Sequence, residues 1–256
     1  MTSSEGIQVV RQGFVNVVTL ERPPHNFVDP KLIGELADTL ARMDEDHQCR
    51  AVVLAASGRS FCAGANFSGV NRTSEAVDPG AFYAQAMRLF RTRKPIVAAV
   101  HGAAVGAGLG LALVADFRVT CAEARFSANF TRLGFHPGFG LSVTLPRLIG
   151  EQTAALLFYT GRRVGGAEAV TMGLADELVA EPDVRKRSIS LAQEIAISSP
   201  LAVQATRATL RHGLAERIAT ANERELEIQR VQFRSRDFQE GIAAMTERRD
   251  PVFLGC

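Results

Sequence analysis

Residues 94–110 read KPIVAAVHGAAVGAGLG, an apolar run that passes directly into a glycine-rich turn. The run at 96–100 predicts a buried strand, and the small residues after it predict a turn that opens a helix ending near residue 114. Backbone N–H groups at such a helix start are accessible to a ligand oxygen. A purely structural interpretation also exists, in which the glycines only permit close helix packing.

The same turn does not fit a dinucleotide-binding loop. The position three residues after Gly108 is Leu111 rather than glycine, so the GxGxxG spacing is missing, and the sequence is not a Walker A loop either. The apolar segment 96–115 is long enough to span a bilayer. It contains His101, is rich in glycine and alanine and is followed at once by Asp116, which favours a buried core segment over a membrane span.

Upstream, short apolar runs alternate with helical spacing. Strands are expected at 7–10, 14–20, 51–56, 96–100 and 116–120, helices at 32–43 and 80–92, and a polar stretch over 68–79. The first two strands are separated by a turn with Gly13 and predict a hairpin. The later succession of strand, crossover helix and strand implies parallel pairing.

The C-terminal part predicts a helical layer. Helices are expected at 151–159, 167–172, 184–197, 200–211, 215–231 and 235–247, with one strand at 176–180. No internal repeat and no linker rich in proline or serine divides the sequence. We therefore expect one folded unit with a helical C-terminal subdomain.

Composition narrows the class of protein. The chain has 256 residues, 46% of them hydrophobic and 22% charged, which excludes disorder as the starting interpretation. The formal net charge is +2 and the C-terminal arginines alternate with glutamates, so we expect no nucleic-acid binding. The cysteines at positions 49, 62, 121 and 256 form no CxxC pair, so we expect no metal site. Free thiols and the lack of a visible secretory signal predict a cytoplasmic location.

A second small-residue turn, Ala63-Gly64-Ala65, also follows a strand of the parallel type. Two such turns at the ends of successive strands can direct two backbone amides toward one point, which is how an oxyanion hole is built. In this order the turns resemble those of the enoyl-CoA hydratase/isomerase family, the crotonase superfamily. The stretches similar to family motifs, in the family's order, are 60–66 (SFCAGAN), 94–102 (KPIVAAVHG) with 105–108 (VGAG), 115–116 (AD), 145–150 (LPRLIG) and 238–244 (FQEGIAA).

The resemblance covers nearly the whole chain and implies an α/β fold, a crotonase-like spiral of ββα units. It implies a spiral core with an acyl-CoA site over residues 1–195 and a helical trimerisation region over residues 196–256. Assembly as a homo-trimer or homo-hexamer is expected on the same ground. Coenzyme A is part of the substrate in this family, so no separate cofactor is expected.

The resemblance also assigns site residues. The backbone N–H groups of Ala65 and Ala107 are expected to bind the thioester oxygen, which gains charge when the neighbouring carbon is attacked or deprotonated. Most relatives have glycine at position 107, so the extra methyl group is expected to narrow the site. The remaining substrate contacts implied by the resemblance are Arg22, His25, Ala63, Gly64, Gly106, Gly110, Phe130 and Phe253.

The usual acid–base residues of the family are missing. The two glutamate positions hold Gly110 and Phe130, and a third carboxylate position, used by isomerases and dehalogenases, holds Gly138. His136 lies in the loop expected to face the acyl group and is the candidate acid or base, because imidazole exchanges protons near neutral pH. The alternative is a surface or packing histidine. Asn129, nearby, can orient water but cannot accept its proton.

Three functions remain open at this level. The first is an acyl-CoA enzyme of hydratase or isomerase type, a lyase or isomerase, with a relocated acid–base group and an atypical reaction. The second is a superfamily enzyme of another reaction, such as hydrolysis of a thioester or a carbon–carbon bond. The third is a non-catalytic acyl-CoA binding protein that keeps the hole and has lost the proton chemistry.

Overall fold

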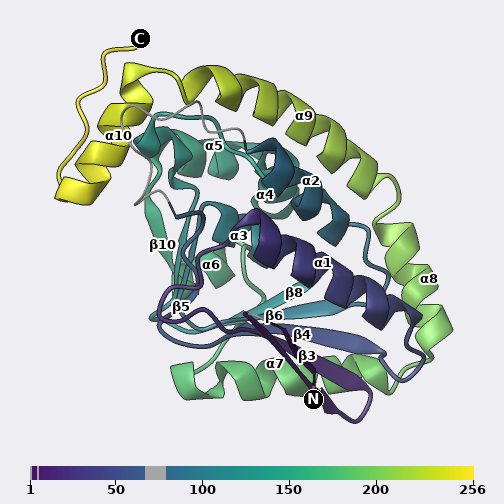
Figure 1. The fold of residues 1–256 in the computed structure, drawn as a ribbon. Coiled ribbons are helices and arrows are strands. Elements are labelled where there is room, and N and C mark those ends of the chain that lie inside the picture. Colours follow the sequence, from purple (N-terminus) through teal and green to yellow (C-terminus); the bar gives the residue numbers. More distant parts are fainter. Residues whose placement is uncertain (1, 5, 67–78) are drawn as a thin grey trace.

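The computed structural model describes residues 2–4, 6–66 and 79–256, and these form two sheets surrounded by helices (Figure 1). The strand order in the larger sheet is β1 (Thr2–Ser4), β2 (Ile7–Gln12), β3 (Val15–Leu20), β4 (Ala51–Ala56), β6 (Ile96–Val100), β8 (Phe117–Thr120) and β11 (Glu177–Leu178). The order in the smaller sheet is β10 (Arg163–Gly165), β9 (Arg125–Ser127), β7 (Ala103–Val105) and β5 (Ser60–Cys62).

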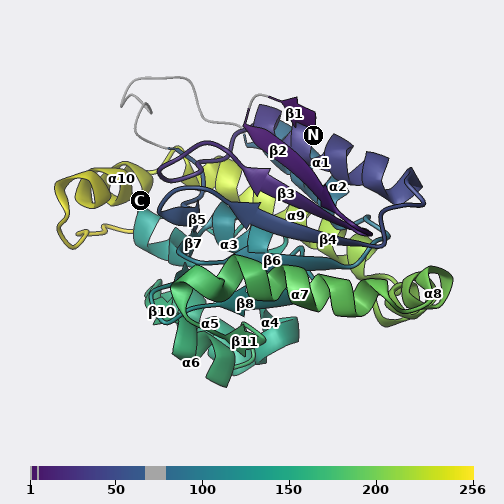
Figure 2. The same ribbon diagram turned by 90° about the horizontal axis from the view of Figure 1, so that it is seen from below.

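Helices cover both faces of the larger sheet. The α-helices of the described residues are α1 (Pro30–Glu45), α2 (Gly80–Leu89), α3 (Ala107–Ala112), α4 (Leu141–Ile149), α5 (Glu151–Thr160), α6 (Gly166–Thr171), α7 (Val184–Ala196), α8 (Pro200–Leu210), α9 (Leu214–Gln232) and α10 (Arg236–Glu247). The short 3-10 helices are η1 (Asn129–Leu133) and η2 (Glu181–Asp183). In Figures 1 and 2, α1 and α2 lie on one face, α7 runs along the opposite face, and α9 arches from α8 to α10.

The core follows from the sequence pattern. Strands β3, β4, β6 and β8 pair in parallel and are almost entirely buried, as expected for unbroken apolar runs covered on both faces. Helix α1 begins where the sequence predicts. The Asp29 side chain accepts the Leu32 N–H at 2.7 Å, and Pro30 occupies the first helical position.

Most predicted elements are confirmed, and the smaller sheet is the main exception. The hairpin, the parallel strands and the C-terminal helices all form, although the strand expected at 176–180 is only β11. The smaller sheet was not predicted, because strands of three residues carry no readable periodicity. Part of the expected glycine-rich turn is in fact β7. The polar stretch expected over 68–79 lies, except for residue 79, outside the described residues.

The apolar segment 96–115 is part of the core, as predicted. It forms β6, β7 and α3, and its apolar side chains are mostly buried inside the protein. In the part of the chain that the structure describes, we find no helix with the length and apolar character that a membrane crossing requires.

Candidate functional site

Two small-residue turns meet beside the smaller sheet. Strands β5 and β7 pair in parallel, with Ser60 opposite Ala103, so the chain leaves both strands at the same end of the smaller sheet. A Cβ atom at Gly64 would lie 2.7 Å from the Val105 carbonyl oxygen and 3.6 Å from the Ala107 backbone nitrogen. The turn after β5 is therefore in contact with the turn after β7.

Both turns require glycine for steric reasons. Gly64 has a φ of 92°, a conformation that residues with side chains rarely adopt. A Cβ atom at Gly108 would lie 2.0 Å from the Cys62 carbonyl oxygen, so no larger residue fits between the two backbones. The Cys62 thiol beside this contact is not a nucleophile, because burial raises its pKa to about 12 and keeps it protonated.

The first turn is held by the segment between β3 and α1. The His25 carbonyl accepts the Ala63 N–H at 3.0 Å, and the Val28 N–H donates to the Gly64 carbonyl at 3.0 Å. Val28 also forms an isolated parallel bridge with Ala65. Three of the predicted contact residues, His25, Ala63 and Gly64, are thus brought together through their backbones.

The second turn opens α3 at Ala107. Gly106 precedes the helix with a φ of 55° and offers no side-chain cap. The N–H groups in the first turn of a helix have no acceptor within that helix. Among the described residues, neither the Ala65 N–H nor the Ala107 N–H donates a hydrogen bond. Both amides are therefore available to an acceptor from outside the chain.

The space beside Gly110 is filled by an aromatic ring. A Cβ atom at Gly110 would lie 2.6 to 2.8 Å from the Cγ, Cδ1 and Cβ atoms of Phe139. Phe139 is fully buried and packs edge-on against Phe82 and Phe90, although its φ of 65° is unfavourable for a residue with a side chain. A glutamate at position 110 is therefore excluded by Phe139 as well as missing from the sequence.

The space beside Gly138 is also filled by side chains. A Cβ atom there would lie 1.9 Å from the Tyr83 hydroxyl oxygen and 2.6 Å from the Gln229 side-chain nitrogen. Tyr83 comes from α2 and Gln229 from α9, and both are buried. Burial raises the pKa of the Tyr83 hydroxyl, so the phenol stays protonated. No side chain larger than hydrogen can begin at position 138.

Phe130 occupies its glutamate position with an aromatic ring. The ring is buried and packs edge-on against Phe135, at 5.5 Å between centroids. A Cβ atom at Gly106 would lie 3.5 Å from the Asn129 side-chain oxygen and 3.8 Å from the tip of the Phe130 ring. The Phe130 ring therefore borders the turn that opens α3, and the Asn129 amide lies beside it.

His136 is bound to α9 through its backbone. Its N–H donates to the Gln232 side-chain oxygen at 2.6 Å, and its carbonyl accepts from the Gln229 side-chain nitrogen at 2.7 Å. The imidazole Nδ1 lies 2.6 Å from the Pro137 carbonyl oxygen. A carbonyl can only accept, so this contact places a proton on Nδ1 and leaves Nε2 able to accept one. Within the described part of the chain, no hydrogen bond links His136 to either turn.

The outer predicted contacts are only partly grouped. Arg22 and His25 share the loop after β3, where Arg22 forms an ion pair with Asp29 at 2.5 Å and the exposed His25 ring lies 3.3 Å from the Ser60 hydroxyl. Phe253 belongs to the segment after α10 and is partly exposed. Within the described ranges of the chain, no hydrogen bond, ion pair or ring contact joins Phe253 to Arg22 or His25. Among the described residues, no group of histidine, cysteine, aspartate or glutamate side chains could hold a metal ion.

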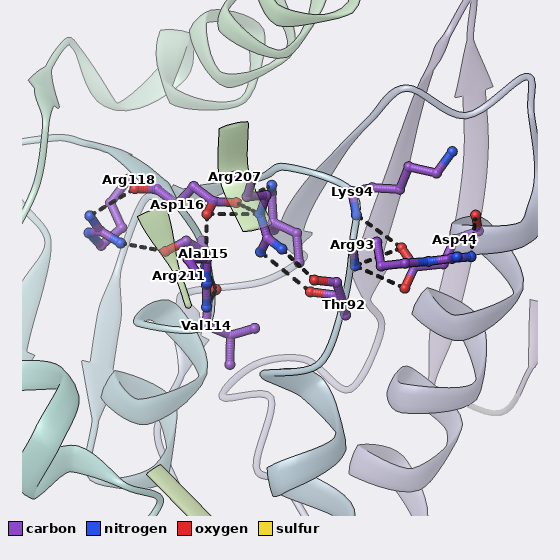
Figure 3. Close-up of polar contacts among 11 residues, drawn as sticks. Asp44, Thr92, Arg93, Lys94, Val114, Ala115, Asp116, Arg118, Arg207 and Arg211 are labelled. Atoms are coloured by element: carbon purple, nitrogen blue, oxygen red, sulfur yellow. Dashed lines mark hydrogen bonds and ion pairs between the residues drawn. The ribbon is translucent and has the colours of Figure 1, made fainter. Parts of the chain in front are cut away.

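A separate polar network fastens α8 to the larger sheet (Figure 3). The Asp116 carboxylate accepts from Arg207 at 2.9 and 3.0 Å, from Arg211 at 2.7 Å and from the Ile96 N–H at 2.8 Å. Burial alone would raise the pKa of Asp116, but the two guanidinium groups hold it below its ordinary value. The network keeps a charged carboxylate under α8, away from the two turns.

Comparison with a protein-family model shows to which family the chain belongs. The model described as Enoyl-CoA hydratase/isomerase matches residues 11–255. The chain belongs to the enoyl-CoA hydratase/isomerase family. The α/β crotonase fold with C-terminal helices, expected from the sequence, is confirmed by solved structures of the family. An enoyl-CoA hydratase/isomerase from Pseudoalteromonas atlantica T6c superposes with a TM-score of 0.88 at 31% identity, over 98% of this chain and all of that one.

Curated members of the enoyl-CoA hydratase/isomerase family are similar along nearly the whole chain. Carnitinyl-CoA dehydratase of Escherichia coli K12 is 31% identical over 98% of this chain and 99% of that protein. The human mitochondrial enoyl-CoA hydratase domain-containing protein 2 is 33% identical over 95% of this chain and 86% of that protein. A solved carnitinyl-CoA hydratase from Mycobacterium avium has a TM-score of 0.88 at 29% identity, covering 99% of this chain and all of that chain. These names support an enzyme of the family that processes acyl-CoA thioesters.

Three residues of this family member were missed by sequence reasoning: Tyr83, Phe139 and Gln229. Each acts by filling or bordering a position left without a carboxylate. The sequence held a weak signal for one of them, since a phenylalanine stands between Gly138 and Gly140 in a glycine-rich loop. Tyr83 and Gln229 lie on helices whose partners a single sequence does not reveal.

Proposed function

We propose that the chain binds an acyl-CoA thioester and holds the thioester oxygen with the backbone N–H groups of Ala65 and Ala107. The observation that carries this proposal is the contact between the two turns, where a Cβ atom at position 64 would lie 2.7 Å from the Val105 carbonyl oxygen and 3.6 Å from the Ala107 nitrogen. Negative charge develops on the thioester oxygen when the neighbouring carbon loses a proton or the enoyl group is attacked. One such hydrogen-bond donor typically stabilises that charge by about 3 kcal/mol.

The reaction we propose is not hydration by two glutamates. Positions 110, 130 and 138 carry no ionisable group, and aromatic side chains fill the space at each of them. Proton transfer must then come from another group, and His136 is our candidate because its Nε2 is left free to accept a proton. In this proposal the enzyme is a lyase or isomerase that uses the polarised thioester, Asn129 to orient a reacting group, and one imidazole.

A second candidate function is non-catalytic binding of an acyl-CoA. The specific observation in its favour is the aromatic filling, since packing has replaced the acid–base side chains while the two amides remain available. A superfamily hydrolase is a further alternative that no particular contact favours. All three functions share the same thioester site, so binding and turnover must be measured separately.

Coenzyme A recognition is the outer part of the proposal. Arg22 belongs to the segment between β3 and α1 and can contact a phosphate group only by sharing its charge with Asp29. The exposed His25 ring stands on the same loop. Phe253 belongs to the C-terminal segment after α10. We propose that it covers the adenine of a coenzyme A molecule bound to a neighbouring subunit.

We also propose a homo-trimer or homo-hexamer built through the helical region 196–256. Helix α8 buries only Arg207, whereas Ile197, Leu201 and Leu210 are 84%, 80% and 72% exposed. A hollow of about 650 Å³ between α4, α7 and α8 adds further apolar surface. Light scattering should report a trimer or hexamer, and Leu201→Glu should shift it toward smaller species. A monomer at every concentration would overturn the assembly.

A cytoplasmic location belongs to the same proposal, since the four cysteines are free.

The test of function uses a panel of acyl-CoA thioesters with the full chain. Calorimetric titration should show micromolar or tighter binding, about 8 kcal/mol or more. Crotonyl-CoA, a longer enoyl-CoA and an aryl enoyl-CoA are then assayed for turnover, and crotonyl-CoA hydration is expected to be slow. If any thioester turns over, His136→Ala should abolish that activity and leave binding nearly unchanged.

Each outcome decides between the candidates. Binding without turnover of any thioester supports the non-catalytic function. Full activity of His136→Ala eliminates this imidazole as the acid or base. Absence of binding to every thioester overturns the acyl-CoA proposal itself.

A further inference from the structure

The face of α9 that packs on the 136–142 loop is unusually polar. Asn222, Glu225 and Gln229 are spaced by three and four residues, so they share one side of the helix, and all three are buried. Buried polar side-chain atoms normally have at least one hydrogen-bond partner each. Glu225 meets that rule, because it accepts from the N–H groups of Gly140 and Ser142 at 2.8 and 3.0 Å.

Gln229 does not meet the rule. Its side-chain nitrogen donates to the His136 carbonyl at 2.7 Å, and because a carbonyl can only accept, the nitrogen and not the oxygen must face that side. The side-chain oxygen then points elsewhere. Gln229 is fully buried, and its side-chain oxygen has no hydrogen-bond donor among the described residues. An unpaired buried acceptor of this kind destabilises the protein unless a donor reaches it.

Tyr83 stands next to this amide. The phenol is hydrogen-bonded by Gln229, and Glu225 is close enough to act on it electrostatically. The phenol oxygen touches Gly138, whose neighbour Phe139 covers Gly110, one helical turn along α3 from the proposed thioester amide. The phenol and the unpaired oxygen therefore lie next to the residue that covers Gly110.

We propose that Tyr83 and Gln229 form a polar subsite that selects acyl-CoA thioesters carrying a hydroxyl group on the acyl chain, farther from the thioester than the reacting carbons. This inference rests on the proposed acyl-CoA function. A hydroxyl group can accept from the phenol O–H and donate to the unpaired Gln229 oxygen at the same time. A carboxylate has no proton to donate to the Gln229 oxygen, and a quaternary ammonium has no N–H group, so neither satisfies both partners.

The test uses matched pairs of saturated acyl-CoA thioesters, with and without a terminal hydroxyl group, over a range of chain lengths. The dissociation constants of each pair are measured by calorimetry on the full chain. In the parent protein at least one hydroxylated thioester should bind about tenfold more tightly than its partner, as expected for a satisfied buried acceptor. In Tyr83→Phe that ratio should fall to about one.

Two further variants control the measurement. Tyr159, the other tyrosine of the chain, is 80% exposed, so Tyr159→Phe should keep the parent's ratio. Gln229→Met removes the unpaired oxygen at similar volume and should abolish the preference independently of Tyr83. Equal binding within every pair of the parent, or a preference that survives both Tyr83→Phe and Gln229→Met, overturns the subsite and leaves the proposed function standing. Absence of binding to every thioester overturns both.

Discussion

The two sides of the candidate site are built in opposite ways. On the side of the two turns, the useful groups are backbone amides, and Gly64 and Gly108 are fixed by backbone oxygens at 2.7 and 2.0 Å from where a Cβ would stand. At two of the usual carboxylate positions, the space beside Gly110 and Gly138 is instead filled by the side chains of Phe139 and Tyr83. A function carried by the backbone is protected by sterics, whereas one carried by side chains can be replaced by packing.

The largest effect is expected when a carboxylate is introduced at position 110, where Phe139 now fills the space. The double variant Gly110→Glu/Phe139→Gly introduces a carboxylate and removes both the ring and the Cβ atom that exclude it, and glycine suits the φ of 65° at position 139. Crotonyl-CoA hydration should rise about 10²-fold or more, because a positioned acid–base group typically contributes about 10² to 10⁴. The rate is followed by loss of the enoyl thioester absorbance.

The single variant Gly110→Glu is the matched control for that experiment. Its Cβ would lie 2.6 Å from the Phe139 ring, so it should lower the free energy of unfolding by about 1–3 kcal/mol without a gain in rate. If the single variant is as stable and as active as the double variant, Phe139 does not fill the carboxylate position.

A smaller but still large effect is expected on the side of the turns. Gly108→Ala places a Cβ atom 2.0 Å from the Cys62 carbonyl oxygen and must separate α3 from β5. Acyl-CoA affinity should fall about a hundredfold, since the two amides no longer point at one oxygen. In Gly165→Ala the nearest atoms lie 3.8 and 4.0 Å away, so calorimetry should give the parent's affinity. Unchanged binding by Gly108→Ala contradicts the proposed hole.

The Asp116 network sharpens the comparison by separating stability from binding. Asp116→Asn leaves Arg207 and Arg211 without a charged partner and should lower the free energy of unfolding by about 3 kcal/mol. In the parent, the pKa of Asp116 is lower when folded than when unfolded, so its contribution is complete above the ordinary value of about 3.9 and is lost as the pH falls through the folded value.

Denaturant unfolding over a series of acidic pH values should show that loss in the parent and a shallower one in Asp116→Asn. Acyl-CoA affinity, measured where both proteins are folded, should be the same, because the network lies away from the turns. A variant with parent stability, or one that is stable but fails to bind, would show that the network and the site are not independent in this way.

The smallest effect is expected for Ala107→Gly. Both residues carry the same backbone N–H group, so acyl-CoA affinity should change by less than about threefold. Phe130→Leu, which shortens a side chain beside the same turn, provides the contrast and should alter the preference among acyl groups more than Ala107→Gly does. A large loss of affinity in Ala107→Gly alone, with the fold intact, would mean that the methyl group rather than the amide matters.

The sequence predicted the two glycine turns better than the side chains packed around them. The turn at Gly64 and the turn at Gly106 to Gly108 were found because small residues after apolar strands are a local pattern. The lack of ionisable groups at positions 110, 130 and 138 was equally readable. The proton acceptor was not readable from the sequence. His136 remains the predicted acceptor, and the contact of its Nδ1 with the Pro137 carbonyl places a proton on that nitrogen.

By itself, the sequence determined most strands of the larger sheet, the longer helices and the two glycine turns, because hydrophobic period, chain reversal and the absence of a Cβ are properties of neighbouring residues. Only the tertiary structure decided what fills the vacated carboxylate positions. Phe139 and Tyr83 reach Gly110 and Gly138 from other segments, and Gln229 joins them from α9. Filling a volume depends on which distant segments meet, and one sequence carries no record of that meeting.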